Sequence, residues 1–180
     1  MVNKLYMEHS IDNTHYGSLH VHLAYSLTGE IYHVRHKLTD GPYAVPSFSD
    51  YSRDVFKRAL LISFAAASKR SAMGAIRSGW QEDFERDQYE GIDLNALLEA
   101  YPEKHNVILD FSTDNALQQQ NLDSRLCESV IRQTLERDIT ILTIHDSFIV
   151  ESQYKDFLIA AMHTACEEAG LSSMPPIEPV

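Results

Sequence analysis

The chain has 180 residues, of which 44% are hydrophobic, and carries a formal net charge of -11 at pH 7. This length can bury one core in a single domain, or one domain with a small subdomain. The acidic balance argues against non-specific affinity for nucleic acid, because neutralising phosphates needs clustered Lys and Arg, although a local basic strip can hide in the average. The longest apolar run is too short to cross a membrane and the first residues lack a signal-peptide core, so we expect a cytoplasmic protein without membrane association.

The first half of the chain predicts two helices separated by a loop. The segment 18–29 has leucines on one face and ends at a glycine, both typical of a helix. Residues 39–50 contain two prolines and a glycine, which predicts a loop. The longest helix is expected over residues 51–76, and Arg53 and Lys57 would lie one turn apart on one of its faces.

Histidines are concentrated at the start of the chain. Imidazole is a good ligand for zinc, copper or nickel, so this clustering leaves a His-rich metal-binding module as an alternative. No metal-ligand spacing between these residues supports it. The six early histidines are His9, His15, His20, His22, His33 and His36.

Residues 80–105 are acidic and irregular, and we expect them to form an excursion on the surface of the protein. Within them, residues 94–101 predict a short helix. Asp93 provides an N-cap for that helix and Pro102 is expected to end it.

The second half predicts two more helices and a tail. The first helix is expected over residues 115–137, capped by Thr113 or Asp114, and the second over residues 154–169. Residues 171–180 are rich in proline and are expected to form an extended tail. Helices around a small buried antiparallel sheet indicate an α+β fold.

The segment 138–154 predicts the centre of that sheet. Two apolar runs flank the polar residues His145, Asp146 and Ser147, which indicates a β-hairpin buried on both faces with these residues at its tip. Asp146 is then either a turn-forming residue or a rigidly held carboxylate suited to bind metal.

Four segments together resemble the palm and fingers of family A DNA polymerases and phage-type single-subunit RNA polymerases. Residues 145–148, His-Asp-Ser-Phe, are similar to motif C, whose Asp binds the catalytic metals in that family. Residues 53–68 resemble motif B, an Arg-x3-Lys helix that faces the incoming triphosphate. Residues 15–20 resemble motif A, and Gln118 with Asp123 resembles the Gln-x4-Asp helix that reaches the template–primer minor groove.

The resemblance covers residues 12–170 and implies both a fold and a chemistry. The fold would be one palm-like domain over residues 1–170, with a reduced fingers-like helical part at about 51–105. The chemistry would be phosphoryl transfer, in which two divalent ions about 3.5–4 Å apart clamp the reacting oxygens. The resemblance assigns catalysis to Asp146, metal binding (Mg²⁺ or Mn²⁺) to Asp146 and His15, nucleotide binding to Arg53 and Lys57, and template–primer contact to Gln118 and His145.

The match departs from the family at two positions and in length. His15 replaces the second metal-binding Asp, and imidazole is a poor ligand for Mg²⁺. Asp12 is a doubtful substitute, since in a strand it would lie roughly 10 Å away on the opposite face. The aromatic-glycine pair that ends motif B is Ala65-Ala66. We also expect no room for a thumb before motif A.

Two hypotheses about function remain open. In the first, the protein is an active minimal nucleotidyltransferase whose missing parts come from another chain. In the second, it is a catalytically impaired palm that binds nucleic acid, a nucleoside triphosphate, a protein partner or a second copy of itself. The departures favour the second hypothesis and predict weak metal binding.

Overall fold

The computed structural model describes residues 10–32, 41–105 and 115–180. Within these ranges the fold is mixed α+β, which confirms the predicted class, with six α-helices and one antiparallel sheet. The helices are α1 (Leu19–Thr28), α2 (Arg53–Phe64), α3 (Lys69–Asp83), α4 (Leu94–Lys104), α5 (Asn115–Leu135) and α6 (Lys155–Glu168). The strands are β1 (Ile11–Tyr16), β2 (Leu142–Ile144), β3 (Ser147–Glu151) and β4 (Ile177–Pro179), in the sheet order β2-β3-β1-β4.

Some predictions fall outside the described ranges. These are the two candidate caps Thr113 and Asp114, the histidines His9, His33 and His36, and the first residues of the loop predicted at 39–50.

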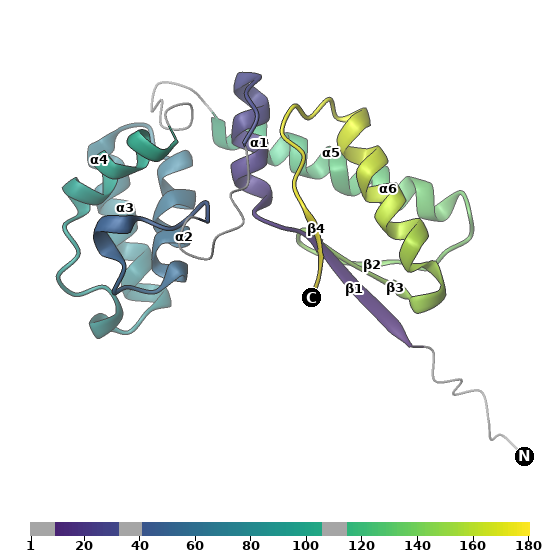
Figure 1. Cartoon of the computed structure of the whole chain (residues 1–180), viewed down its shortest axis with the longest axis horizontal. Helices are drawn as coiled ribbons and strands as arrows, with labels where there is room; N and C mark the ends of the chain where they lie inside the picture. The colour runs from purple at the N-terminus through teal and green to yellow at the C-terminus, as the bar shows by residue number, and fades with distance from the viewer. Residues whose placement is uncertain (1–9, 33–40, 106–114) are drawn as a thin grey trace, which may run out of the picture.

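Helix α1 stands between two lobes (Figure 1). Helices α2, α3 and α4 form the helical lobe, while the sheet with α5 and α6 forms the sheet lobe. Val21 and Tyr25 of α1 belong to the core of the helical lobe, and Leu19 and Leu23 belong to the core of the sheet lobe. A helix that is apolar on two faces is buried on both, so α1 joins the two cores. It ends, as predicted, where Gly29 adopts the left-handed conformation (φ 76°).

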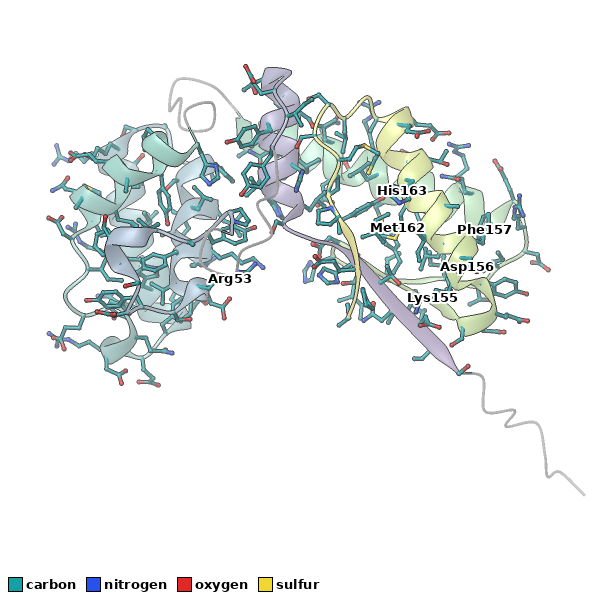
Figure 2. The ribbon with its side chains drawn as sticks, in the orientation of Figure 1. Arg53, Lys155, Asp156, Phe157, Met162 and His163 are labelled. Atoms are coloured by element: carbon teal, nitrogen blue, oxygen red, sulfur yellow. The ribbon has the colours of Figure 1, made fainter. Side chains whose placement is uncertain are left out.

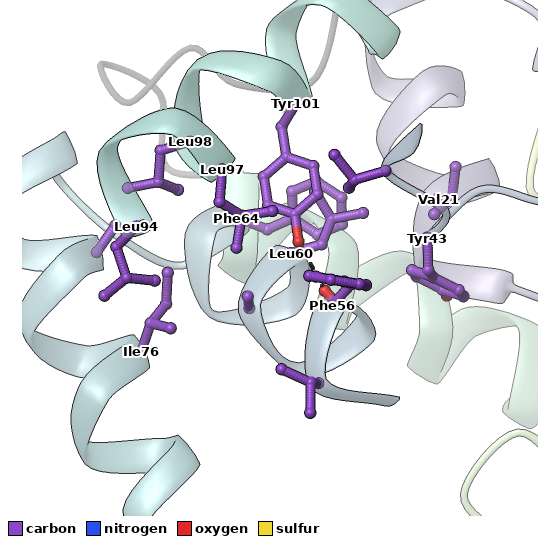
Figure 3. Close-up of a cluster of buried hydrophobic side chains, with 14 of the residues drawn as sticks. Val21, Tyr43, Phe56, Leu60, Phe64, Ile76, Leu94, Leu97, Leu98 and Tyr101 are labelled. Atoms are coloured by element: carbon purple, nitrogen blue, oxygen red, sulfur yellow. Dashed lines mark hydrogen bonds between the residues drawn. The ribbon is translucent and has the colours of Figure 1, made fainter. Parts of the chain in front are cut away.

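The core of the helical lobe is formed by apolar side chains from all three of its helices (Figure 3). Tyr101 donates its hydroxyl hydrogen bond to the Phe56 carbonyl at 2.9 Å, and Trp80 donates from Nε1 to the Val55 carbonyl at 3.0 Å. Both aromatic side chains are fully buried with their polar atoms satisfied. The prediction that residues 80–105 form a surface excursion is therefore wrong, because this segment contributes Trp80, Leu94, Leu97, Leu98 and Tyr101 to a buried core.

The prediction of one long helix over residues 51–76 is also wrong, because two helices form there. The chain leaves the helix after Phe64 and starts α3 at Lys69. Ser68 caps α3 by accepting a hydrogen bond from the backbone of Ser71, whose own side chain accepts from the Ser68 backbone. This reciprocal capping box stabilises a new helix start, so α3 can fold back against α2.

Helix α4 begins at the predicted cap, where the Asp93 carboxylate accepts hydrogen bonds from the backbone of Asn95 and Ala96. It does not end at Pro102 but continues to Lys104. A proline so near a helix end disturbs only the last turn, and the anchoring of Tyr101 on α2 holds that turn in place.

The hairpin forms as predicted, but it is not buried on both faces. Phe148 and Val150 of β3 are buried in the core with α5 and α6, whereas Leu142 and Ile144 of β2 are 62% and 56% exposed. The register pairs Leu142 with Ile149 and Ile144 with Ser147, so these side chains point away from Phe148. Among the described residues, helices cover one face of the sheet and leave the other open (Figure 1), and β2 is its edge strand.

The proline-rich end of the chain is extended, and its last residues join the sheet as β4. This strand pairs antiparallel with β1 and places Glu178 opposite His15. The segment before it is anchored on α1, where Ser173 donates its backbone N–H to Ser26 Oγ at 3.0 Å and its hydroxyl lies 2.9 Å from His22 Nδ1.

Candidate functional site

The hairpin tip is a two-residue turn between β2 and β3. Ile144 pairs directly with Ser147, which leaves His145 and Asp146 in the turn. His145 has a positive φ of 55°, as the first position of a tight hairpin turn requires. His145 is exposed and Asp146 half-buried, so the packed strands hold the Asp146 carboxylate at a fixed place on the surface.

Strand β1 brings the segment that resembles motif A against this tip. His15 pairs with Ser147 across β1 and β3, and the Tyr16 backbone N–H donates to the Asp146 carbonyl at 3.3 Å. Strand β1 thus places His15 next to the turn that carries Asp146. Tyr16 anchors the strand, because its ring packs edge-on against Phe148 and its hydroxyl donates to the Met162 carbonyl at 2.8 Å.

The side chains of His15 and Asp146 nevertheless have different neighbours. His15 lies on the open face of the sheet, where its Nε2 is 3.9 Å from the Glu178 carboxylate of β4. The charge of Asp146 instead contributes to raising the pKa of Asp123 of α5 and of Tyr43. The sheet therefore joins the two backbones, while the His15 imidazole faces Glu178 and the Asp146 carboxylate influences Asp123 and Tyr43.

Asp123 is a second carboxylate beside the tip. Burial raises its pKa above the usual range, and the charge of Asp146 raises it further, while His20 and His145 act in the opposite direction. Two carboxylates and two imidazoles thus share one electrostatic environment between α1, α5 and the turn.

Arg53 lies on the side of the helical lobe that faces the sheet lobe (Figure 2). Its guanidinium carbon lies 4.8 Å from the centre of the Tyr43 ring, a cation–π distance. Burial raises the pKa of Tyr43; Ser18 and Arg53 lower it and Asp146 raises it. The buried Tyr43 therefore contacts the Arg53 cation, and the negative charge of Asp146 raises its pKa. Lys57, one helical turn after Arg53, is exposed.

The remaining predicted residues are less closely connected. Gln118 is exposed on the first turns of α5, whereas its neighbour Gln119 is buried. Ala65 and Ala66 follow the last residue of α2, in the break before α3.

Asp12, the weak candidate for the missing acid, is held elsewhere. It pairs in register with the buried Val150 on the helix-covered face, opposite to His15. Lys155 donates a hydrogen bond to its carboxylate at 2.8 Å, and this bond is the main reason that the Asp12 pKa is lowered.

The early histidines that lie in the described ranges, His15, His20 and His22, do not gather at one place. His22 is buried against Ser173, and His15 faces Glu178. Across the described ranges, no group of three or more His, Cys, Asp or Glu side chains is arranged to hold a metal ion.

The sequence did not predict that Tyr43 would contact Arg53 or that Glu178 would face His15. Tyr43 stands in a Gly-Pro-Tyr loop and Glu178 in a proline-rich segment, neither of which carries a signal for a site. Asp123 had a signal, its spacing from Gln118, but its closeness to Asp146 arises only when α5 packs beside the hairpin tip.

None of the described helices combines the length and apolarity that crossing a membrane requires. Comparison of the chain with protein-family models and with curated proteins found no match in either.

Proposed function

We propose that this protein is a divergent polymerase palm and fingers protein, related to template-directed nucleotidyltransferases, that acts by binding rather than by synthesis. Its ligands would be a nucleoside triphosphate and nucleic acid at the hairpin tip. The observation that carries the proposal is that Tyr43 contacts the guanidinium of Arg53, from the segment resembling motif B, while the charge of Asp146, from the segment resembling motif C, raises the pKa of the same tyrosine. These residues are far apart in the sequence.

The chemistry of the tip favours binding. Arg53 offers a planar donor for phosphate oxygens and the exposed Lys57 a point charge one turn later. Catalysis of phosphoryl transfer additionally needs hard oxygen ligands for divalent ions. His15 provides imidazole at the place where the related polymerases have a carboxylate, and it faces Glu178 instead of the tip.

Calorimetric titration with a nucleoside triphosphate tests the proposal. Charge-assisted hydrogen bonds contribute about 1.5–3 kcal/mol each, so Arg53→Ala and Lys57→Ala should each weaken binding by roughly ten- to a hundredfold. Arg70→Ala removes an exposed cation from α3 and serves as the matched control, with unchanged affinity expected. Absence of binding, or equal affinity in all four proteins, would refute the proposed nucleotide site.

A second candidate function is an active nucleotidyltransferase that uses Mg²⁺ or Mn²⁺ at Asp146, with a partner chain supplying the missing parts. Asp123 favours it, because this residue lines one groove with His145 of the tip and its pKa is raised by the charge of Asp146, so it offers a second carboxylate there. Primer extension with either ion distinguishes the two functions. Extension by the wild-type protein that is lost in Asp146→Asn and in Asp123→Asn would establish the second candidate. Nucleotide binding without extension would support the first.

A further inference from the structure

The outer surface of α5 borders a groove of about 1020 Å³. Two neighbouring rows of α5 side chains line it, each with i, i+4 spacing, and His145 of the hairpin tip contributes to its wall. One row consists of Asp123, Cys127, Ile131 and Leu135, and the other of Gln120, Ser124, Glu128, Arg132 and Glu136. Adjacent rows of this kind form the ridges between which a ridge of a second helix packs.

The first of these rows is apolar over most of its length. Leu135 is 67% exposed, and Cys127 and Ile131 are half-buried. A smaller hollow of about 340 Å³ shares Ile131 and Leu135 and extends the apolar surface to Ile139 and Ile141. The buried stripe of α5 is a different one, formed by Leu122, Leu126 and Val130. Helix α5 thus has a second apolar stripe that the described part of the chain leaves open.

The second row gives the groove an acidic edge. Glu128 is exposed and forms no ion pair or hydrogen bond with any other described residue. Arg132 contributes a cation, but Glu168 at 2.7 Å and Glu136 at 3.6 Å already neutralise it. The chain as a whole carries a net charge of -11, so a partner for this surface gains from positive charge.

We propose that this groove binds an amphipathic helix of a protein partner, with an apolar stripe on one face and Lys or Arg along its flanks. The groove follows α5 from Gln120 to Glu136, about 24 Å at 1.5 Å per residue, which matches roughly four turns of helix. The apolar side chains of the partner would lie over Ile131 and Leu135, and its cations would lie beside Glu128, as in other helix-in-groove complexes. A second copy of this acidic chain fits less well, since like charges would meet.

The test is a fluorescence anisotropy titration of the full chain with a labelled peptide of about 18 residues, built from Leu and Lys to form one apolar face. We expect binding that weakens at about 1 M salt, where the screening length falls to about 3 Å. The same peptide with Glu in place of Lys should bind at least about tenfold more weakly, because its charges repel the edge of the groove.

Variants locate the binding surface. Removing a leucine from an apolar contact costs on the order of 1.5–3 kcal/mol, so Leu135→Ser should weaken binding about tenfold or more. Glu128→Lys should also weaken it. Leu117→Ser is the matched control, since Leu117 is 61% exposed on the same helix but does not line the groove. All three residues are exposed, so the variants should fold.

Four results would overturn the proposal. The first is no binding of the Leu/Lys peptide, and the second is binding that Leu135→Ser leaves unchanged. The third is a dimer in light scattering that Leu135→Ser dissociates, which would assign the groove to a second copy. Loss of binding in Leu142→Ser with retention in Leu135→Ser would move the surface to the exposed edge strand β2 and would also refute the proposed groove.

Discussion

The backbone N–H of Tyr16 donates a hydrogen bond to the carbonyl oxygen of Asp146 at 3.3 Å. This bond extends the β1–β3 ladder one step beyond the pair His15 and Ser147, so main-chain bonding holds the end of β1 against the hairpin tip. Side chains alternate between faces along a strand. The His15 imidazole therefore faces Glu178 of β4, while the charge of the Asp146 carboxylate contributes to raising the pKa of Asp123.

Replacing His15 by aspartate should raise the affinity for Mg²⁺. The new carboxylate would lie beside Glu178 on the open face of the sheet, and hard oxygen ligands suit this ion. The expected gain is about tenfold, roughly 1.4 kcal/mol, in calorimetric titrations. Wild-type protein should bind weakly and prefer Mn²⁺, which accepts imidazole more readily. Adding Glu178→Gln to His15→Asp should remove the gain; equal Mg²⁺ affinity in wild type and His15→Asp would mean that His15 has only a structural role.

Stability should fall in mild acid because of His22. Burial lowers the pKa of this imidazole to about 4, below its ordinary value of about 6.5. Between those two values the unfolded chain binds a proton that the folded chain does not, so the contribution is present above pH 6.5 and is lost as pH falls toward 4.

Urea unfolding at pH 7.5 and pH 5 measures this loss, which we expect to be about 2 kcal/mol for this one group. His22→Gln cannot be protonated and should flatten the pH dependence by that amount, whatever its stability at neutral pH. His163→Gln changes an exposed histidine of α6 and should keep the wild-type pH dependence. Identical slopes in His22→Gln and wild type would contradict the prediction.

Ser68→Ala should destabilise the helical lobe. The Ser68 hydroxyl accepts a hydrogen bond from the Ser71 backbone at 3.1 Å and caps α3. Loss of such a cap costs about 1 kcal/mol, measurable as a lower urea midpoint. Ser78→Ala, at an exposed position inside the same helix, should change stability by only a few tenths of a kcal/mol. Equal midpoints for the two variants would show that the cap does not define the start of α3.

Lys155→Met should raise the pKa of Asp12. The hydrogen bond from Lys155 is the main cause of the lowered pKa of this carboxyl group, and Figure 2 places Lys155 at the start of α6 beside β1. Carboxyl chemical shifts followed by NMR during an acid titration would record the change. Lys69→Met breaks the ion pair of Lys69 with Glu99 in the other lobe and should leave the Asp12 titration where it was. An unmoved Asp12 titration in Lys155→Met would mean that another group holds this carboxylate.

Local chemistry accounts for the parts of the fold that sequence alone determined. Gly29 ends α1 because glycine adopts a left-handed backbone without steric cost. Asp93 starts α4 because its carboxylate accepts the free N–H groups of the first turn. The hairpin turn at His145 and Asp146 follows from two β-rich runs separated by a polar break. Each of these features depends on residues within a few positions of one another.

Tertiary packing decided the rest, because burial of a segment depends on what the remainder of the chain places against it. The apolar stretch after Arg53 reads as one helix, yet packing of α3 back on α2 makes it two. Leu142 and Ile144 are as apolar as core residues but remain exposed, since the helices in the described part of the chain cover the other face of the sheet. Likewise, the family resemblance assigned His15 and Asp146 to one metal site, but only the arrangement of α5 and β4 placed Glu178 beside His15 and brought Asp123 under the influence of the Asp146 charge.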